Sequence, residues 1–284
     1  MKKEKEGSIR ARKIRAGIFQ ALGFVLTVIL YLVPAVFVIL TSFKSDLESM
    51  RLQLSLPEIW HWENYPTVIK HQNYAVLTGL KNSALLAFFA IILIVISCSL
   101  GGYILQRRKG KLTNIVNVLI LAGLMIPPAI VPTIWVLNGL GIYKTIFGMV
   151  LVETALMTPF ATILYRGYVG SVPKEIEEAA LVDGCKPIQM FIRVVFPLLK
   201  PVTSTIITLD VVTIFNDFTN PLYFLPGAKN FTAQLTLYNF TGQFASSYNL
   251  LYADVVIILM VPLILYIFFN KQIVAGMTSG AVKG

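Results

Sequence analysis

Six long apolar runs constrain the fold of this 284-residue sequence more than any other feature. A helix needs roughly 20 mostly apolar residues to cross the hydrocarbon core of a bilayer. Because no water is present there, the backbone must satisfy its own hydrogen bonds, as a helix does. The sequence therefore predicts an all-α integral membrane protein with six transmembrane helices, at residues 18–43, 80–105, 112–137, 146–165, 195–222 and 251–269.

The composition agrees with a membrane protein and excludes several other classes. Hydrophobic residues make up 56% of the chain and charged residues 13%, whereas soluble domains have about 25% charged residues. Cys98 and Cys185 predict no disulfide, and His61 and His71 lack the neighbouring ligands of a metal site. Since no set of residues at catalytic spacing is visible, we expect no catalytic residue, no metal and no enzyme.

The basic residues lie mainly on one side of the predicted spans. They precede the first span, follow the second and flank the connector after the fourth: Lys2, Lys3, Lys5, Arg10, Arg12, Lys13, Arg15, Arg107, Arg108, Lys109, Lys111, Arg166, Lys174, Lys186, Arg193 and Lys200. By the positive-inside rule this side is cytoplasmic. We expect a cytoplasmic segment 1–16, a membrane domain 17–272 and a cytoplasmic tail 273–284. The net charge of +10 then needs no nucleic-acid partner.

The connector after the fourth span, residues 166–197, predicts two short helices. Ser171 is a plausible N-cap and Pro173 suits a first turn. Gly184 would end the first helix in the left-handed conformation, and Pro187 would start the second. An apolar stripe on the second helix recurs at helical spacing through Ile188, Phe191, Ile192 and Val195. The connector is either an ordinary amphipathic hairpin or a rigid helix that fits a groove on a cytosolic partner.

Part of this connector resembles the EAA loop of the permeases of ATP-binding-cassette importers. Glu178, Ala179 and Ala180 are followed by Gly184 and by the sequence Val194-Val195-Phe196-Pro197. The family pattern is E-A-A, G and then I-x-L-P. The resemblance implies a bundle like that of type I importer permeases, with a coupling helix that contacts a separate ATPase. The implied coupling residues are Glu178, Ala179, Ala180, Asp183, Gly184 and Pro197.

Further motifs resemble the carbohydrate branch of these permeases, in particular the smaller, second permease of maltose-type heterodimers. They are Ser42-Phe43-Lys44, Met125-Ile126-Pro127, Pro159-Phe160, Pro221-Leu222 and the tail 275–284. One departure is Phe215-Asn216, where the branch usually has Trp-Asn, so the tryptophan of the family pattern is absent there. The resemblance implies a multi-pass protein of the bacterial cytoplasmic membrane with both termini inside, and a sugar or oligosaccharide as the substrate.

The energy source would lie outside this chain. The sequence contains no G-x-x-x-x-G-K-[S/T] phosphate loop, so the chain itself needs no cofactor, and ATP and Mg would bind the partner ATPase. The resemblance implies four kinds of protein or lipid partner: a second related permease, an ATPase dimer, an extracellular solute-binding protein and membrane lipid.

Two carboxylates within predicted spans, Glu153 and Asp210, reach similar depths. Intramembrane carboxylates usually face a water-filled cavity or a partner. They would line a sugar path together with Phe215, Asn216 and Asp217, or would form structural hydrogen bonds within the bundle. The same pair would also serve an ion-coupled secondary transporter, which is the main alternative function.

The predicted outer loop, residues 223–249, resembles the loop with which such permeases contact the binding protein. The implied docking residues are Phe231, Thr232, Ala233, Gln234 and Leu235. The alternative is a solvated connector that contains a short helix.

Overall fold

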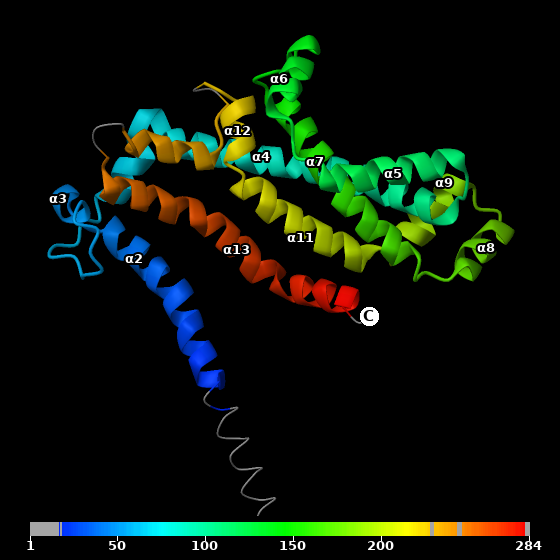
Figure 1. Cartoon of the computed structure of the whole chain (residues 1–284), viewed down its shortest axis with the longest axis horizontal. Helices are drawn as coiled ribbons and strands as arrows, with labels where there is room; N and C mark the ends of the chain where they lie inside the picture. Colours follow the sequence, from blue (N-terminus) through cyan, green and yellow to red (C-terminus); the bar gives the residue numbers. More distant parts are fainter. Residues whose placement is uncertain (1–16, 18, 228–229, 243–245, 282–284) are drawn as a thin grey trace, which may run out of the picture. The chain divides into compact units, whose positions relative to one another are not determined.

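The computed structural model describes residues 17, 19–227, 230–242 and 246–281 (Figure 1). These residues are predominantly helical, and their single β-bridge joins Thr241 to Ser246. The predicted segment 1–16 and the last three residues of the predicted tail lie outside the described residues. The chain divides into two compact units, Met1–Asn73 with Leu237–Ile257, and Tyr74–Thr236 with Ile258–Gly284.

The first unit contains an apolar helix, Phe19–Ser42, whose second half is the π-turn η1 (Val28–Leu32) and α2 (Val33–Ser42). It also contains α3 (Asp46–Ser49) and the starts of α4 (Asn64–Arg107) and α13 (Tyr248–Ala281). Lys44 is buried, and its Nζ donates to the Gln53 carbonyl at 2.8 Å and to Ser55 Oγ at 2.9 Å. Buried charges need such partners, so these bonds fix the chain after α2.

The second unit carries the rest of α4 and most of the remaining helices. They are α5 (Lys111–Met125), α6 (Ile130–Gly139), α7 (Ile146–Val169), α8 (Lys174–Val182), α9 (Pro187–Met190), η2 (Phe191–Val195), α10 (Phe196–Leu198), α11 (Lys200–Asn216), α12 (Thr219–Phe224) and η3 (Ala233–Phe240). Within this unit α8 and α9 lie near one end of α11, and α12 lies at the other (Figure 1).

The core of the second unit lies where α4, α7 and α11 pack together. It includes Leu86, Ile94, Tyr165 and Ile206, all at most 1% exposed. A Cβ added at Gly102 would stand 2.7 Å from Tyr165 Cβ. Because any larger side chain would clash there, Gly102 permits the close approach of α4 and α7.

Three of the described helices are long and apolar enough to cross a membrane: Phe19–Ser42, Asn64–Arg107 and Ile146–Val169. A fourth span would be the pair Pro187–Leu198 and Lys200–Asn216, which is bent by 73°. Shorter apolar helices are Lys111–Met125, Ile130–Gly139 and Tyr248–Ile264. Six spans remain compatible with this arrangement if α5 and α6 together form the third span and α13 the sixth.

The predicted third and fifth spans are interrupted where prolines cluster. After α5 ends at Met125, Ile126 is extended with φ −85° and ψ 121°, as a residue before proline prefers. Pro127 and Pro128 separate α5 from α6. The expected run 195–222 is likewise divided into α10, α11 and α12. At these prolines the predicted spans are therefore broken into shorter helices.

Candidate functional site

The connection between α7 and α11 forms the most distinctive site; we name residues 170–199 the α8–α9 hairpin. Its first helix, α8, ends at Val182, and Gly184 follows the C-cap in the left-handed conformation, as predicted. Gly184 has φ +82°, and its N–H donates to the Leu181 carbonyl at 3.0 Å. The Cys185 N–H donates to the Ala180 carbonyl at 3.0 Å. These two bonds form a Schellman motif, which satisfies carbonyls that the helix end leaves free.

Of the two predicted helix starts in the hairpin, one is confirmed and the other is wrong. Pro187 begins α9 as predicted. The predicted N-cap role of Ser171 is wrong, because Pro173 precedes α8 and Ser171 Oγ donates to the Tyr168 carbonyl at 2.7 Å. Ser171 therefore stabilises the end of α7 instead of the start of α8.

A buried carboxylate, Glu177, joins the hairpin to α4. Its Oε1 accepts from Arg107 Nε at 2.7 Å and lies 2.6 Å from Arg107 Nη2, while its Oε2 accepts from Tyr103 Oη at 2.8 Å. Arg107 Nη2 also donates to the Val172 carbonyl at 2.8 Å. The two charged side chains are only 12% and 10% exposed. A planar guanidinium with several bonds fixes orientation as well as distance, so this cluster sets the position of α8.

The second helix of the hairpin contains a π-turn, η2, and this changes the predicted apolar stripe. The buried residues are Met190, Phe191 and Val195, and a spacing of five from Met190 to Val195 suits a π-turn. Ile188 and Ile192 are 73% and 58% exposed. Of the four residues in the predicted stripe, Phe191 and Val195 therefore pack inward and the two isoleucines do not.

The predicted coupling residues lie on both sides of the hairpin. Glu178, Ala179, Asp183, Gly184 and Pro197 are exposed, whereas Ala180 is 7% exposed. Large apolar side chains are also exposed on this hairpin: Ile176, Leu181, Val182, Ile188 and Ile192. Val182 reaches 88% exposure. The hairpin thus presents apolar and acidic side chains together on a surface that the described residues leave uncovered.

The predicted path residues lie toward the other end of α7 and α11. Glu153 and Asp210 are 1% and 3% exposed. The Glu153 carboxyl lies near the side chains of Asp217, Asn220 and Asp210. Asp217 in turn accepts from Asn220 Nδ2 at 2.6 Å. The structure therefore brings the three acids together, with Asn220 as a further member that the sequence reasoning missed.

The other two predicted path residues differ in exposure. Phe215 is 2% exposed and belongs to the packed interior, whereas Asn216 is exposed. Asn216 Oδ1 accepts from Gln234 Nε2 over a long 3.4 Å. Gln234 belongs to the predicted docking loop, so the loop and the predicted path are adjacent at this point.

The predicted docking residues occupy the 230–236 segment, which packs against α4. Thr232 and Ala233 are 2% and 0% exposed. The Ala233 N–H donates to Ser83 Oγ at 3.0 Å, and the Phe231 carbonyl accepts from Asn82 Nδ2 at 3.0 Å. Of the five predicted docking residues, Phe231, Gln234 and Leu235 are partly exposed. A docking partner would therefore contact these three side chains and not the two buried ones.

Comparison with known proteins identifies a family for this arrangement. The family described as "Binding-protein-dependent transport system inner membrane component" matches residues 94–279. The chain is 34% identical over 206 residues to the melibiose/raffinose/stachyose import permease protein MelC of Bacillus subtilis. This alignment covers 72% of the chain and 75% of MelC. It is 29% identical to the probable starch degradation products transport system permease protein AmyC of Thermoanaerobacterium thermosulfurigenes, over 92% and 95% of the two chains.

A solved structure shares the fold. It is the crystal structure of a bacterial ABC transporter involved in the import of the acidic polysaccharide alginate, with a TM-score of 0.79 and 20% identity. The match covers 90% of this chain and 95% of that chain.

Proposed function

This chain belongs to the family of inner membrane components of binding-protein-dependent transport systems, and we propose from this premise that it is a permease subunit that imports a sugar or oligosaccharide. The two relatives above are named for melibiose, raffinose and stachyose and for starch degradation products. The transporter with the same fold imports alginate. The shared chemistry of these substrates, several hydroxyl groups on linked rings, supports a saccharide for this chain.

The observation that carries the mechanism is the exposed surface of the α8–α9 hairpin on a fixed base. Val182 and Ile188 would enter an apolar groove on the partner ATPase, while Glu178 and Asp183 would meet basic side chains at its rim. Burial of apolar surface would supply most of the affinity. The Glu177–Arg107 pair would transmit the movement, because α8 cannot shift without moving the end of α4.

The proposed orientation and partners follow from this contact. The hairpin would face the cytoplasm, where the ATPase dimer holds ATP and Mg, and both termini would lie on the same side. A second related permease would complete the membrane part, and an external binding protein would deliver the sugar to the 230–236 segment. Phe231, Gln234 and Leu235 are the predicted docking side chains available for that contact.

The acidic cluster is the proposed polar part of the path. Carboxylates accept hydrogen bonds from hydroxyl groups, and side-chain amides both donate and accept them. Asn216 is exposed and would contact substrate first, while Glu153, Asp210 and Asp217 lie deeper in the same unit. Family membership favours ATP-driven transport over the ion-coupled alternative that these carboxylates also allow.

Reconstitution tests this function. Vesicles that contain the chain, its second permease and its ATPase, with binding protein outside and ATP inside, are expected to accumulate a labelled oligosaccharide. Removal of ATP should abolish uptake and a protonophore should leave it unchanged. Val182→Glu should lower uptake at least tenfold, whereas Leu47→Glu, at another exposed apolar residue distant in sequence from the hairpin, should not. Uptake by the chain alone on a proton gradient would contradict the proposal.

A further inference from the structure

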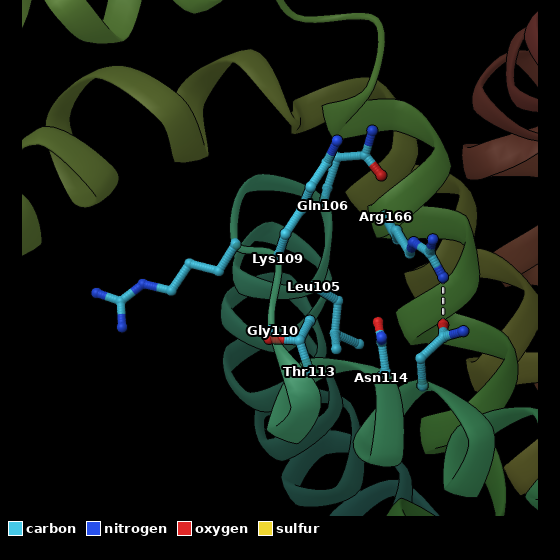
Figure 2. Close-up of a pocket in the computed structure, with 9 residues that line it drawn as sticks. Leu105, Gln106, Lys109, Gly110, Thr113, Asn114 and Arg166 are labelled. Atoms are coloured by element: carbon cyan, nitrogen blue, oxygen red, sulfur yellow. Dashed lines mark hydrogen bonds between the residues drawn. The ribbon is translucent and has the colours of Figure 1, made fainter.

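A pocket of about 430 Å³ lies at the turn between α4 and α5. Its lining comes from α4, α5, α7 and the turn between α4 and α5, and includes Gln106, Arg108, Lys109, Asn114, Asn117 and Arg166. Figure 2 shows Lys109 extending toward Gln106 at one end of the pocket, with Thr113 and Asn114 at the other. Sites for small ligands have volumes of roughly 300–1,000 Å³, so this pocket is large enough to hold one.

The charge of the lining points to an anion. Three of the nine residues are cations, four are amides or hydroxyls, and none is acidic. Arg107, the neighbouring cation, is already paired with Glu177 outside the pocket. Arg166 on α7 donates to Asn117 on α5, which holds the guanidinium at the wall (Figure 2). An amide oxygen does not neutralise this cation, so the positive charge in the pocket remains uncompensated by the lining.

The backbone adds to this positive potential. Helix α5 begins at Lys111, and its N-cap residue is Gly110, which offers no side-chain cap. The first N–H groups of a 15-residue helix carry a partial positive charge. They lie beside Arg108 and Lys109, so the helix start reinforces the charge of the side chains.

The surface beside the pocket identifies the kind of anion. On α5 the polar residues Thr113, Asn114 and Asn117 line the pocket. Leu121 and Leu124, four and seven residues after Asn117, lie on the same face of this helix and are 45% and 50% exposed. A polar pocket that continues into exposed apolar side chains matches a charged headgroup with acyl chains attached. A free phosphate or an acidic protein side chain would leave this apolar surface without a role.

We propose that the pocket between α4, α5 and α7 binds the headgroup of an anionic phospholipid. Basic pockets between membrane helices bind such headgroups, with about 1 kcal/mol for each Lys or Arg near the surface. Removal of one cation should then weaken binding about fivefold, and removal of all three about a hundredfold. In the orientation proposed above, this lipid lies in the inner leaflet, beside the root of the α8–α9 hairpin.

Native mass spectrometry of the purified full chain tests this proposal without the ATPase or any transport. The probes are phosphatidylglycerol and phosphatidylcholine with identical acyl chains. We expect phosphatidylglycerol to bind at least tenfold more tightly than phosphatidylcholine. The variant Arg108→Gln/Lys109→Gln/Arg166→Gln should lose this preference. Millimolar inorganic phosphate should leave it unchanged. Each single variant should retain part of the affinity, which keeps the test informative if the triple variant folds poorly.

The matched control is Lys174→Gln/Lys186→Gln/Lys200→Gln, which removes three exposed charges of the hairpin region outside the pocket. It should retain the preference for phosphatidylglycerol. Equal binding of both lipids, equal loss in the control, or displacement by inorganic phosphate would overturn the proposal. A pocket variant that binds both lipids as the unmodified chain does, but no longer binds the ATPase, would also overturn the proposal. That result would make the pocket a contact site for the ATPase.

Discussion

The α8–α9 hairpin and the 230–236 segment both connect helices of the second unit, and different kinds of interaction hold them. The hairpin is joined to α4 by a charged cluster around Glu177, at distances of 2.6–2.8 Å. The 230–236 segment is joined to α4 by neutral hydrogen bonds of 3.0 Å to Ser83 and Asn82. A Cβ added at Gly79 would also stand 3.0 Å from the Ala233 backbone, so small residues bring this segment close.

The two connections also differ in what they expose. The hairpin leaves Val182 and Ile188 largely uncovered, whereas the 230–236 segment buries Thr232 and Ala233. The hairpin is held by a charged cluster at its base, so the rest of it can project apolar side chains. The 230–236 segment packs along its whole length, so it forms part of the bundle. The difference suggests that the hairpin moves as one body with the end of α4 and that the 230–236 segment is part of the bundle wall.

The largest expected effect comes from removal of the charged attachment. Arg107→Ala leaves the Glu177 carboxylate buried without its partner, and breaking a buried pair in this way costs about 3 kcal/mol or more. Amide exchange in α8 should accelerate about a hundredfold, and uptake by the assembled transporter should fall at least tenfold. Hydrogen exchange of the chain alone and vesicle uptake measure the two effects.

A double-mutant cycle separates the pair from other effects of the substitution. Glu177→Ala should also loosen α8, and Arg107→Ala/Glu177→Ala should lose less than the sum of the two single variants, because no charge is then left without its partner. Arg51→Ala removes an exposed cation far from α8 in sequence and should change nothing. Additive effects in the cycle would show that the pair does not hold the hairpin.

The next effect distinguishes the inner and outer sides of α8. Ala180 is buried, so Ala180→Leu overpacks the hairpin and should cost about 2 kcal/mol. Ala179 is exposed, so Ala179→Leu should leave the chain's own stability unchanged and weaken only the contact with the ATPase. Thermal unfolding of the chain measures the effect at the buried side of α8, and co-purification with the ATPase measures the effect at the exposed side. Equal behaviour of both variants would contradict this orientation of α8.

A smaller effect concerns the turn of the hairpin. Gly184 has φ +82°, and a β-branched residue in this region costs between about 1 and 2 kcal/mol. Gly184→Val should still insert into the membrane but bind the ATPase about tenfold more weakly. Gly184→Asn is the matched control, since Asn tolerates this conformation, and it should keep most of the binding. Normal co-purification of the Val variant would count against the coupling role of the turn.

Short-range signals made parts of both connections predictable from the sequence. Gly184 and Pro187 act on residues within one helical turn, so their roles in ending and starting helices were predicted correctly. The six apolar runs likewise predicted a helical membrane protein, and family membership confirms that class. The E-A-A and glycine spacing needs no tertiary information, which explains why the family was identified from residues alone.

Long-range contacts explain what was missed. Glu175, Glu177 and Glu178 look equivalent in the sequence, and only the rotation of α8 against α4 selects Glu177 to meet Arg107, 70 residues away. The burial of Thr232 and Ala233 depends in the same way on contact with α4. The π-turn was not predictable from helical spacing, because an extra residue per turn changes which side chains face inward.

The smallest expected effect tests the neutral attachment of the 230–236 segment. Asn82→Ala removes the donor to the Phe231 carbonyl, a partly buried bond of 3.0 Å, and such a bond contributes about 1 kcal/mol. Amide exchange between residues 230 and 236 should accelerate about fivefold, while exchange in α8 stays unchanged. Lys81→Ala, at the adjacent exposed residue of α4, should alter neither region. Because the bond lies at one point of a packed segment, the Ala233–Ser83 bond should keep the segment in place, so binding-protein-dependent uptake should fall less than twofold. A loss of uptake as large as that of Arg107→Ala would show that this segment, too, depends on a single attachment.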